Sequence, residues 1–352
     1  MTRNPASVVE QPSGQARHSI ALAHHVFQVH QRRAEGVGQA PQGPDVGDRL
    51  PVLVACAKLR TMPPSPATSA QLRRLLDLFP ASVITEHFEV DATKDDAIAE
   101  IVDSDEAEAT IFQFARANHW LTHQHVYLFE LQRISPADLP DDPVGLPLLY
   151  ESNTGRARRS WFYFLEVQYN IVIDNPLAHE TMDFLWPLFI DCRENRLLLS
   201  FTILQTSLRP YLPDARPLVR SERSLNENRA IGLVLDNSDL LDRSRPLDFN
   251  AGIKALWDAD MIDAPTVQYK RELATATEAM DEEFLVKRDD PDLYNRTRES
   301  PLLNTLFYWR GEDGPGIEKF TVDPSQGFFR FRRFSDSVDA VPNLIEAILE
   351  RN

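Results

Sequence analysis

The most regular pattern in the chain is an alternation of apolar and polar residues that begins at Trp161. Every second residue from Trp161 to Ile173 is apolar, and the positions between them include Glu166 and Gln168. Successive side chains of a strand point to opposite faces, so this alternation predicts a long antiparallel strand with one buried face. Residues 197–205 predict a second strand in the same region.

Apolar spacing and turn residues predict the other elements. A period close to that of an α-helix predicts helices at 69–79, 93–102, 179–189, 271–287 and 339–350. Short apolar runs between polar or turn residues predict strands at 52–59, 82–90, 109–115, 123–132, 303–310, 317–322 and 328–334. The last three strands and the final helix are expected to form a β-meander closed by a helix. Residues 207–248 are expected to form a long surface excursion.

The order of these elements and the placement of proline predict an α+β fold with two domains. Residues 1–50 are polar or rich in glycine, and they are expected to be disordered apart from a short helix and a linker. Alternating strands and helices predict a small α/β domain at 51–135. Four prolines within 136–147 exclude regular strand pairing and predict a linker there. Residues 148–352 are then expected to form a mainly antiparallel domain with flanking helices and the terminal meander.

Composition narrows the class of protein. Of the 352 residues, 43% are hydrophobic and 26% are charged, which is typical of a globular chain. No apolar run approaches the ~20 residues of a membrane span, and the N-terminus lacks the pattern of a secretory signal. The cysteines, Cys56 and Cys192, lie far apart in apolar runs, which favours buried thiols over a disulfide. We therefore expect a cytoplasmic protein without membrane partners.

The net charge and the positions of the arginines indicate which macromolecules the chain could bind. The chain carries 37 Lys and Arg against 53 Asp and Glu, a formal charge of −16, which disfavours broad binding to nucleic acid but permits a local basic groove. Arginines gather at three places: Arg156, Arg158 and Arg159, then Arg216, Arg220 and Arg223, then Arg330 and Arg332 between phenylalanines. Arginine interleaved with aromatic residues can pair phosphates and stack on bases.

These arginines lead to the first functional hypothesis. We expect a non-catalytic binding or assembly protein, without a cofactor, that engages a macromolecular partner, either protein or nucleic acid. The sequence lacks a GxxxxGK[ST] or GxGxxG phosphate loop, a GxSxG elbow and a CxxC motif, which lowers the weight of several enzyme classes. Association into a homo-oligomer stays open, and a setting such as host–virus conflict is a background expectation for a rapidly diverging sequence.

An alternative hypothesis is a metal-dependent phosphodiesterase or nuclease. Asp258 and Asp263 precede Gln268 and Lys270, and this stretch loosely resembles the PD-(D/E)xK nucleases, with Gln in place of the usual acid. The resemblance implies that the acids and Gln268 hold Mg²⁺ while Lys270 orients the attacking water. It requires the Gln268 and Lys270 side chains within about 5 Å of an Asp carboxylate, because ion–ligand distances are ~2.1 Å.

Two further sites are considered. His123 and His125 would share one face of a strand and could supply two imidazoles to Zn²⁺ or Fe²⁺, but no third ligand is evident, so ordinary sheet histidines are the simpler interpretation. The polar side of the long strand, with Glu166, Gln168 and Asn170, could instead line the pocket of a small-ligand sensor.

Overall fold

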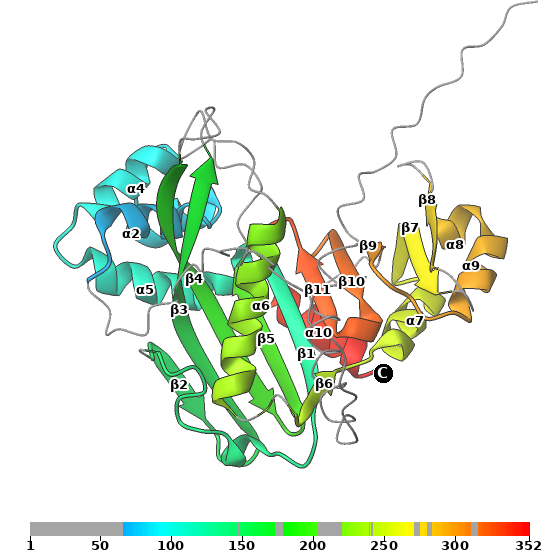
Figure 1. Ribbon diagram of the computed structural model, residues 1–352. Coiled ribbons are helices and arrows are strands. Elements are labelled where there is room, and N and C mark those ends of the chain that lie inside the picture. The colour runs from blue at the N-terminus through cyan, green and yellow to red at the C-terminus, as the bar shows by residue number, and fades with distance from the viewer. Residues whose placement is uncertain are drawn as a thin grey trace, which may run out of the picture.

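The computed structural model describes residues 66–352 apart from 147, 173–178, 203–219, 239, 241, 271–274, 280–283 and 311–315. This part of the chain combines helices with one large antiparallel sheet of eleven strands (Figure 1). The expected α+β class is therefore confirmed. The N-terminal expectations, including the disordered region 1–50 and the strand 52–59, lie outside the described residues.

The sheet follows the order β2-β3-β4-β5-β1-β11-β10-β9-β7-β8, and β6 also pairs with β1. Its strands are β1 (Gln124–Leu131), β2 (Tyr150–Asn153), β3 (Arg158–Val172), β4 (His179–Arg193), β5 (Arg196–Thr202), β6 (Ser244–Pro246), β7 (Ile262–Lys270), β8 (Thr275–Ala279), β9 (Thr305–Trp309), β10 (Lys319–Asp323) and β11 (Phe328–Phe331). The helices are α2 (Ser69–Leu76), α3 (Ala81–Phe88), α4 (Lys94–Val102), α5 (Ala107–Asn118), α6 (Arg220–Asn237), α7 (Asn250–Asp258), α8 (Val286–Asp289), α9 (Pro291–Arg298) and α10 (Ala340–Leu349). Short 3₁₀ turns occur at η1 (His119–Leu121), η2 (Pro136–Asp138) and η3 (Pro324–Gln326).

Strand β1 lies in the middle of the sheet. Its residues pair with β5 on one side and with β11 on the other. β1 precedes the proline-rich segment 136–147, whereas both of its neighbours follow that segment. One sheet thus runs through both of the expected domains, and the division at 136–147 stays a prediction.

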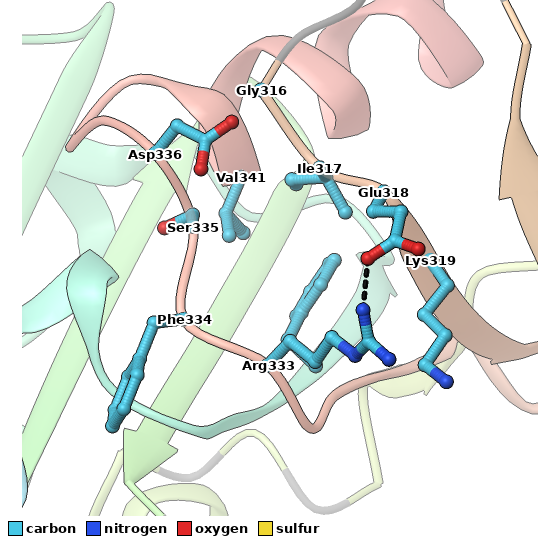
Figure 2. Close-up of a pocket in the computed structure, with 10 residues that line it drawn as sticks. Gly316, Ile317, Glu318, Lys319, Arg333, Phe334, Ser335, Asp336 and Val341 are labelled. Atoms are coloured by element: carbon cyan, nitrogen blue, oxygen red, sulfur yellow. Dashed lines mark hydrogen bonds and ion pairs between the residues drawn. The ribbon is translucent and has the colours of Figure 1, made fainter. Parts of the chain in front are cut away.

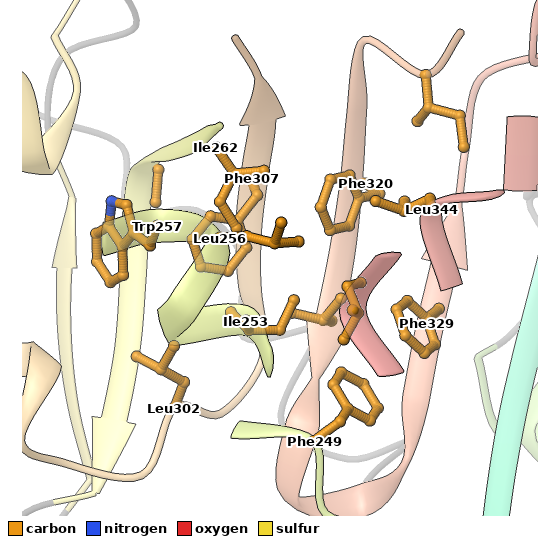
Figure 3. Packing of buried hydrophobic residues seen from close by; sticks show 14 of the residues in the cluster. Phe249, Ile253, Leu256, Trp257, Ile262, Leu302, Phe307, Phe320, Phe329 and Leu344 are labelled. Carbon is orange, nitrogen blue, oxygen red and sulfur yellow. The ribbon is translucent and has the colours of Figure 1, made fainter. Parts of the chain in front are cut away.

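Three hydrophobic clusters hold helices against the sheet. One lies between α6 and the face formed by β3, β4, β5 and β1, and Figure 1 shows α6 crossing in front of β5. A second lies between α2–α5 and the opposite face of β3 and β4. The third lies between α7, α9, α10 and strands β7–β11, where Trp257, Phe307 and Phe320 are fully buried (Figure 3).

Several predicted elements are confirmed. The alternation that begins at Trp161 forms β3, whose alternate residues Trp161, Tyr163 and Leu165 are buried under α6. The terminal meander exists as β9, β10 and β11 with α10 after it. Helices α2 and α4 and strands β1 and β5 also occupy regions where they were expected.

Other elements were predicted wrongly. Residues 82–90 and 109–115, expected as strands, belong to helices α3 and α5. In α5, Ile111, Phe114 and Ala115 are buried at helical spacing, so one side of a helix accounts for the apolar run. Residues 271–287, expected as a helix, contain β8 and the start of α8.

The expected helix at 179–189 is strand β4, which pairs with β3 along its whole length. Trp186 and Leu188 face α6, whereas Leu185 packs against the α2–α5 side. A strand buried on both faces loses its alternation, and its apolar residues can then mimic a helical period. Pro187 is accommodated because β5 pairs with β4 only from Leu188 onward.

Candidate functional site

The arginines before the long strand lie at the β2–β3 hairpin. Arg156 is exposed in the turn between the strands. Arg158 Nε donates a 2.7 Å hydrogen bond to Asp191 Oδ1 on β4, and this bond raises the pKa of the guanidinium. Of these two residues, Arg158 is therefore already engaged by a carboxylate within the sheet.

Arg159 is almost completely enclosed, with 3% of its surface exposed. Its Nη1 donates to the Leu139 carbonyl at 2.7 Å, and its Nη2 lies 2.9 Å from Asp141 Oδ1 and 2.7 Å from Glu151 Oε1. Two carboxylates and a carbonyl thus accept from one guanidinium. Arg159 fastens the segment after η2 to the edge of the sheet and does not face solvent.

The third arginine cluster meets one of the candidate metal ligands at the centre of the sheet. Arg330 Nε on β11 lies 3.1 Å from His125 Nε2 on β1, and His125 Nδ1 lies 3.2 Å from Glu227 Oε1 on α6. Because a guanidinium only donates, Nε2 accepts and the imidazole proton lies on Nδ1, toward Glu227. These three residues are at most 7% exposed. Burial and the nearby Glu227 also raise the pKa of Tyr127.

This Glu227–His125–Arg330 chain joins the helix and two strands that meet at the middle of the sheet. Its chemistry is that of a neutral imidazole bridging a carboxylate and a guanidinium in a dry environment. His123, by contrast, contacts Phe334 with tilted rings whose centroids are 4.6 Å apart, and burial lowers its pKa. Across the described part of the chain, no group of three His, Cys, Asp or Glu residues is placed to hold a metal ion.

Four further arginines belong to the sequence hypothesis. Arg332 is exposed directly after β11. Arg220 lies at the start of α6 and Arg223 one turn later, and their side chains are outside the described atoms. Arg216 lies outside the described residues.

The acids proposed for the nuclease alternative are hydrogen-bonded within the fold. Asp263 is 3% exposed and accepts from the Trp257 indole N–H at 3.0 Å and from the backbone N–H groups of Lys287 and Arg288 at 3.0 and 3.1 Å. It therefore anchors the first turn of α8. Asp258 accepts from the Tyr294 hydroxyl and from Arg298, 2.8 Å away.

Gln268 and Lys270 lie farther along β7. Gln268 Nε2 donates to Thr277 Oγ1 of β8 at 3.2 Å. Five residues of extended chain, about 16 Å, separate Gln268 from Asp263. The nuclease resemblance requires Gln268 and Lys270 to lie beside the two acids. The structure does not bring these residues together.

Register instead places Gln268 and Lys270 on a broad polar surface. Residues that pair across antiparallel strands point to the same face, so Gln268 joins Thr277, and Lys270 joins Thr275. The pairs of β7 with β9 and of β9 with β10 extend this face. We call it the open face: Thr266, Gln268, Lys270, Thr275, Thr277, Leu306, Tyr308, Lys319 and Thr321.

The open face is the side of β7–β10 away from the third hydrophobic cluster. On the cluster side, Val267, Phe307 and Phe320 are buried against α7 and α10 (Figure 3). Each of the nine residues on the open face is exposed or half-buried. Strands β7–β10 thus bury one face and present the other to solvent among the described residues.

The chemistry of the open face differs from that of the chain as a whole. Two of its nine residues are lysines and none is Asp or Glu, although the protein carries a net charge of −16. Lys319 Nζ lies 5.8 Å from the centre of the Tyr308 ring. Two acids lie on the same side of the sheet, Asp263 opposite Tyr308 and Asp323 farther along β10, but they are only 3% and 1% exposed. The face therefore offers cations, hydroxyl groups, an amide and an aromatic ring.

A small pocket adjoins the open face beside Lys319 (Figure 2). It encloses about 80 Å³ between β10, β11 and the N-terminal end of α10, and an ion pair between Arg333 and Glu318 lies at its rim. A second, more open cavity of about 310 Å³ lies between η2 and the end of α6. The smaller pocket is well below the ~300–1,000 Å³ of drug-sized ligand sites and suits a water molecule or a small ion.

The small-ligand alternative had relied on polar residues of β3. Glu166 Oε1 accepts from Gln71 Nε2 at 3.1 Å, and Gln168 donates to Asp183 at 2.9 Å. These two side chains therefore connect β3 to α2 and to β4. The side chain of Asn170 lies outside the described atoms.

Sequence reasoning missed Tyr308, Lys319 and Glu227. The first two occupy expected strands, but only the pairing of β9 with β7 and β10 puts them on the same face as Gln268 and Lys270. Glu227 lies in a stretch that was expected to be a surface excursion. For these three residues the sequence shows only the residue type, and the residue type does not show which residues lie next to it in the fold.

Comparison with protein-family models, curated proteins and solved structures finds no match to this chain. Among the described residues, no helix combines the length and apolar character that crossing a membrane requires.

Proposed function

We propose that this protein is a non-catalytic binding protein that holds single-stranded nucleic acid on its open face. The observation that carries the proposal is the local reversal of charge: Lys270 and Lys319 lie on a sheet face without a carboxylate at its nine positions, in a chain of net charge −16. Lysines attract phosphates, and aromatic rings on a sheet stack with bases.

The same surface is less suited to a protein partner. The cores of protein interfaces are enriched in aromatic residues and depleted in lysine. Leu306 and Tyr308 are the large apolar side chains of the open face, and Leu306 lies between Thr266 and Thr321 in the register. Threonine hydroxyls and the Gln268 amide can donate and accept hydrogen bonds with phosphates and bases.

The spacing of the cations fits a short segment of nucleic acid. Lys270 lies at the end of β7 and Lys319 at the start of β10, two strands away in the sheet. Strand geometry puts their Cα atoms about 20 Å apart. Tyr308 neighbours Lys319, so a bound strand would meet a phosphate contact at each end and a stacking surface next to one of them.

Binding is tested by fluorescence anisotropy with a labelled oligothymidylate of about 16 nucleotides, titrated first at about 50 mM salt and then at rising salt. Each phosphate contact on a single strand contributes about 0.7 to the slope of log K against log salt. We expect Lys270→Gln and Lys319→Gln each to lower that slope by about this amount. Lys254→Gln on α7, behind the sheet, is the matched control and should leave the slope unchanged.

Stacking is tested separately at Tyr308. We expect Tyr308→Ala to weaken binding by the roughly 1–3 kcal/mol typical of one stacked base, and Tyr308→Phe to retain it. The proposal fails if the wild-type protein does not bind the oligonucleotide at low salt. It also fails if the two lysine variants bind with the same salt dependence as the control.

A further inference from the structure

A second surface, independent of the open face, lies at the opposite end of the sheet. β2 is the first strand in the order, and in the described part of the chain it pairs only with β3. The Thr154 N–H donates to the Arg158 carbonyl at 2.9 Å, which fixes the phase of the hydrogen bonding. Antiparallel bonding alternates, so the backbone groups of Glu151 and Asn153 point away from β3 toward the free edge.

Exposed apolar side chains are concentrated at this edge. Leu148, Leu149 and Tyr150 are 39%, 37% and 40% exposed and follow one another in the chain. Only two other large hydrophobic residues of the described chain, Phe284 and Phe334, are comparably exposed. A contiguous apolar patch beside unpaired backbone groups marks an interaction site rather than scattered surface residues.

Charges near the edge indicate what kind of chain it accepts. The Asp141 side chain is 99% exposed and that of Glu151 is 29% exposed, whereas the Arg159 guanidinium between them is 4% exposed. The solvent-facing charge beside β2 on this side is therefore negative, and the exposed Arg156 lies beyond β2, in the turn to β3. On the other side of β2, Tyr150 lies beneath the Arg116 guanidinium, 4.4 Å from it.

We propose that the β2 edge binds an extended segment of another protein by strand addition, and that this segment alternates basic and apolar residues. Its basic side chains would face Glu151 and Asp141, and its apolar side chains would face Tyr150 and Leu148. Main-chain bonds to Glu151 and Asn153 supply affinity, and the alternation supplies specificity. A second copy of this chain is a poorer occupant, because it would bring the same exposed acids and a further charge of −16.

The test uses a synthetic peptide of alternating lysine and valine, with a scrambled peptide of identical composition as the reference, and calorimetry as the readout. We expect the alternating peptide to bind at least about tenfold more tightly, a difference of about 1.4 kcal/mol. Asn153→Pro removes the outward N–H and should abolish this preference. Asn153→Ala keeps the N–H and removes the same side chain, so it should bind like the wild type.

A second measurement does not depend on how the proline variant folds. N-methylation of alternate peptide amides should abolish binding in one phase and preserve it in the other, because only every second amide of an added strand faces β2. Equal binding of the alternating and scrambled peptides, or of both methylated phases, would overturn the proposal. Concentration-dependent dimers that Asn153→Pro abolishes would assign the edge to a second copy and overturn the stated partner. None of these outcomes bears on oligonucleotide binding by Lys270 and Lys319.

Discussion

Lowering the pH should destabilise this protein through His119, whose side chain is buried at the end of α5. Its Nδ1 lies 2.8 Å from the Arg116 carbonyl and donates to it. The ring packs against Trp120, Phe189 and Phe162, with centroids 4.7, 4.9 and 5.3 Å away. Burial among these rings lowers the pKa of His119 from 6.5 to about 4.

The sign of the effect follows from which state binds the proton. Between pH 6.5 and about 4 the unfolded chain protonates this imidazole, whereas the folded protein keeps it neutral. The stability contributed by the neutral form is therefore complete above pH 6.5 and is lost as the pH falls toward 4. A shift of 6.5 − 4 = 2.5 pH units at 1.36 kcal/mol per unit corresponds to about 3 kcal/mol.

A second buried group opposes this trend. Burial raises the pKa of Asp323 from 3.8 to about 6, so the folded protein takes up that proton before the unfolded chain does. The folded state gains stability relative to the unfolded state as the pH falls from about 6 to 3.8, again by about 3 kcal/mol. The total stability of the wild type therefore does not isolate His119, and a comparison between variants is required.

The assay is urea unfolding of the wild type and of His119→Gln at pH 7 and at pH 4.5. Other titrating groups cancel in the difference between the two proteins, so the stability advantage of the wild type should shrink by roughly 2–3 kcal/mol at the lower pH. His87→Gln, at an exposed histidine of α3, is the control for replacing a histidine elsewhere in the fold. An advantage of His119 that is equal at both pH values would refute the assignment.

Three further variants test the interior contacts by chemical unfolding. Asp263→Ala leaves an indole N–H and two backbone N–H groups without their acceptor. We expect the free energy of unfolding to fall by about 3–5 kcal/mol, as for a broken buried pair. A loss below about 1 kcal/mol would contradict the anchoring role of Asp263. Gly252→Ala would place a Cβ 2.1 Å from the Ile348 carbonyl oxygen, so we expect a loss of at least about 2 kcal/mol as α7 and α10 separate. Arg159→Met leaves the buried Leu139 carbonyl without its donor, whereas the carboxylates of Asp141 and Glu151 are 99% and 29% exposed, so we expect a loss of about 1–3 kcal/mol. Arg156→Met at the exposed turn should stay within about 0.5 kcal/mol of the wild type.

Local sequence patterns predicted elements whose burial is one-sided. In the second half of β3, Leu165, Val167 and Tyr169 face α6 while Glu166 and Gln168 between them are exposed. In its first half, Phe162 and Phe164 are covered from the other side as well, so the expected single buried face holds only for the second half. α10 was predicted because Leu344, Ile345 and Ile348 form one buried stripe. In α10 and in the second half of β3, one face of the element contacts the core, so the period of the sequence predicts the element.

Patterns failed where tertiary contacts decide the structure. α6 is polar around most of its surface and lacks a wide apolar stripe, yet Ala230, Val234 and Leu235 are buried against the sheet. Its position depends on the sheet that it covers rather than on helical periodicity. β4 failed for the opposite reason, since it is buried on both faces.

At the candidate sites too, the sequence shows the residue types but not which residues are neighbours in the fold. The nuclease alternative combined Asp258 and Asp263 with Gln268 and Lys270 because this stretch loosely resembles the PD-(D/E)xK pattern. Whether an acid binds a metal or anchors a helix depends on the donors around it, and those of Asp263 come from α7 and α8. Arg330 and His125 are 205 positions apart, so only the pairing of β1 with β11 could reveal their contact.

The two proposed surfaces follow from one property of the sheet. Its order brings strands from distant parts of the chain together, and each helix covers only part of a face. Arginines that the sequence offered as ligand contacts, such as Arg159 and Arg330, are enclosed where elements meet, because a buried guanidinium needs partners. Groups available for binding remain where no described element packs: lysines and hydroxyl groups on the open face, and backbone groups at the β2 edge. These two surfaces lie in opposite halves of one continuous sheet, so nucleic acid and a protein strand could be held at the same time, as assembly of the two on one protein requires.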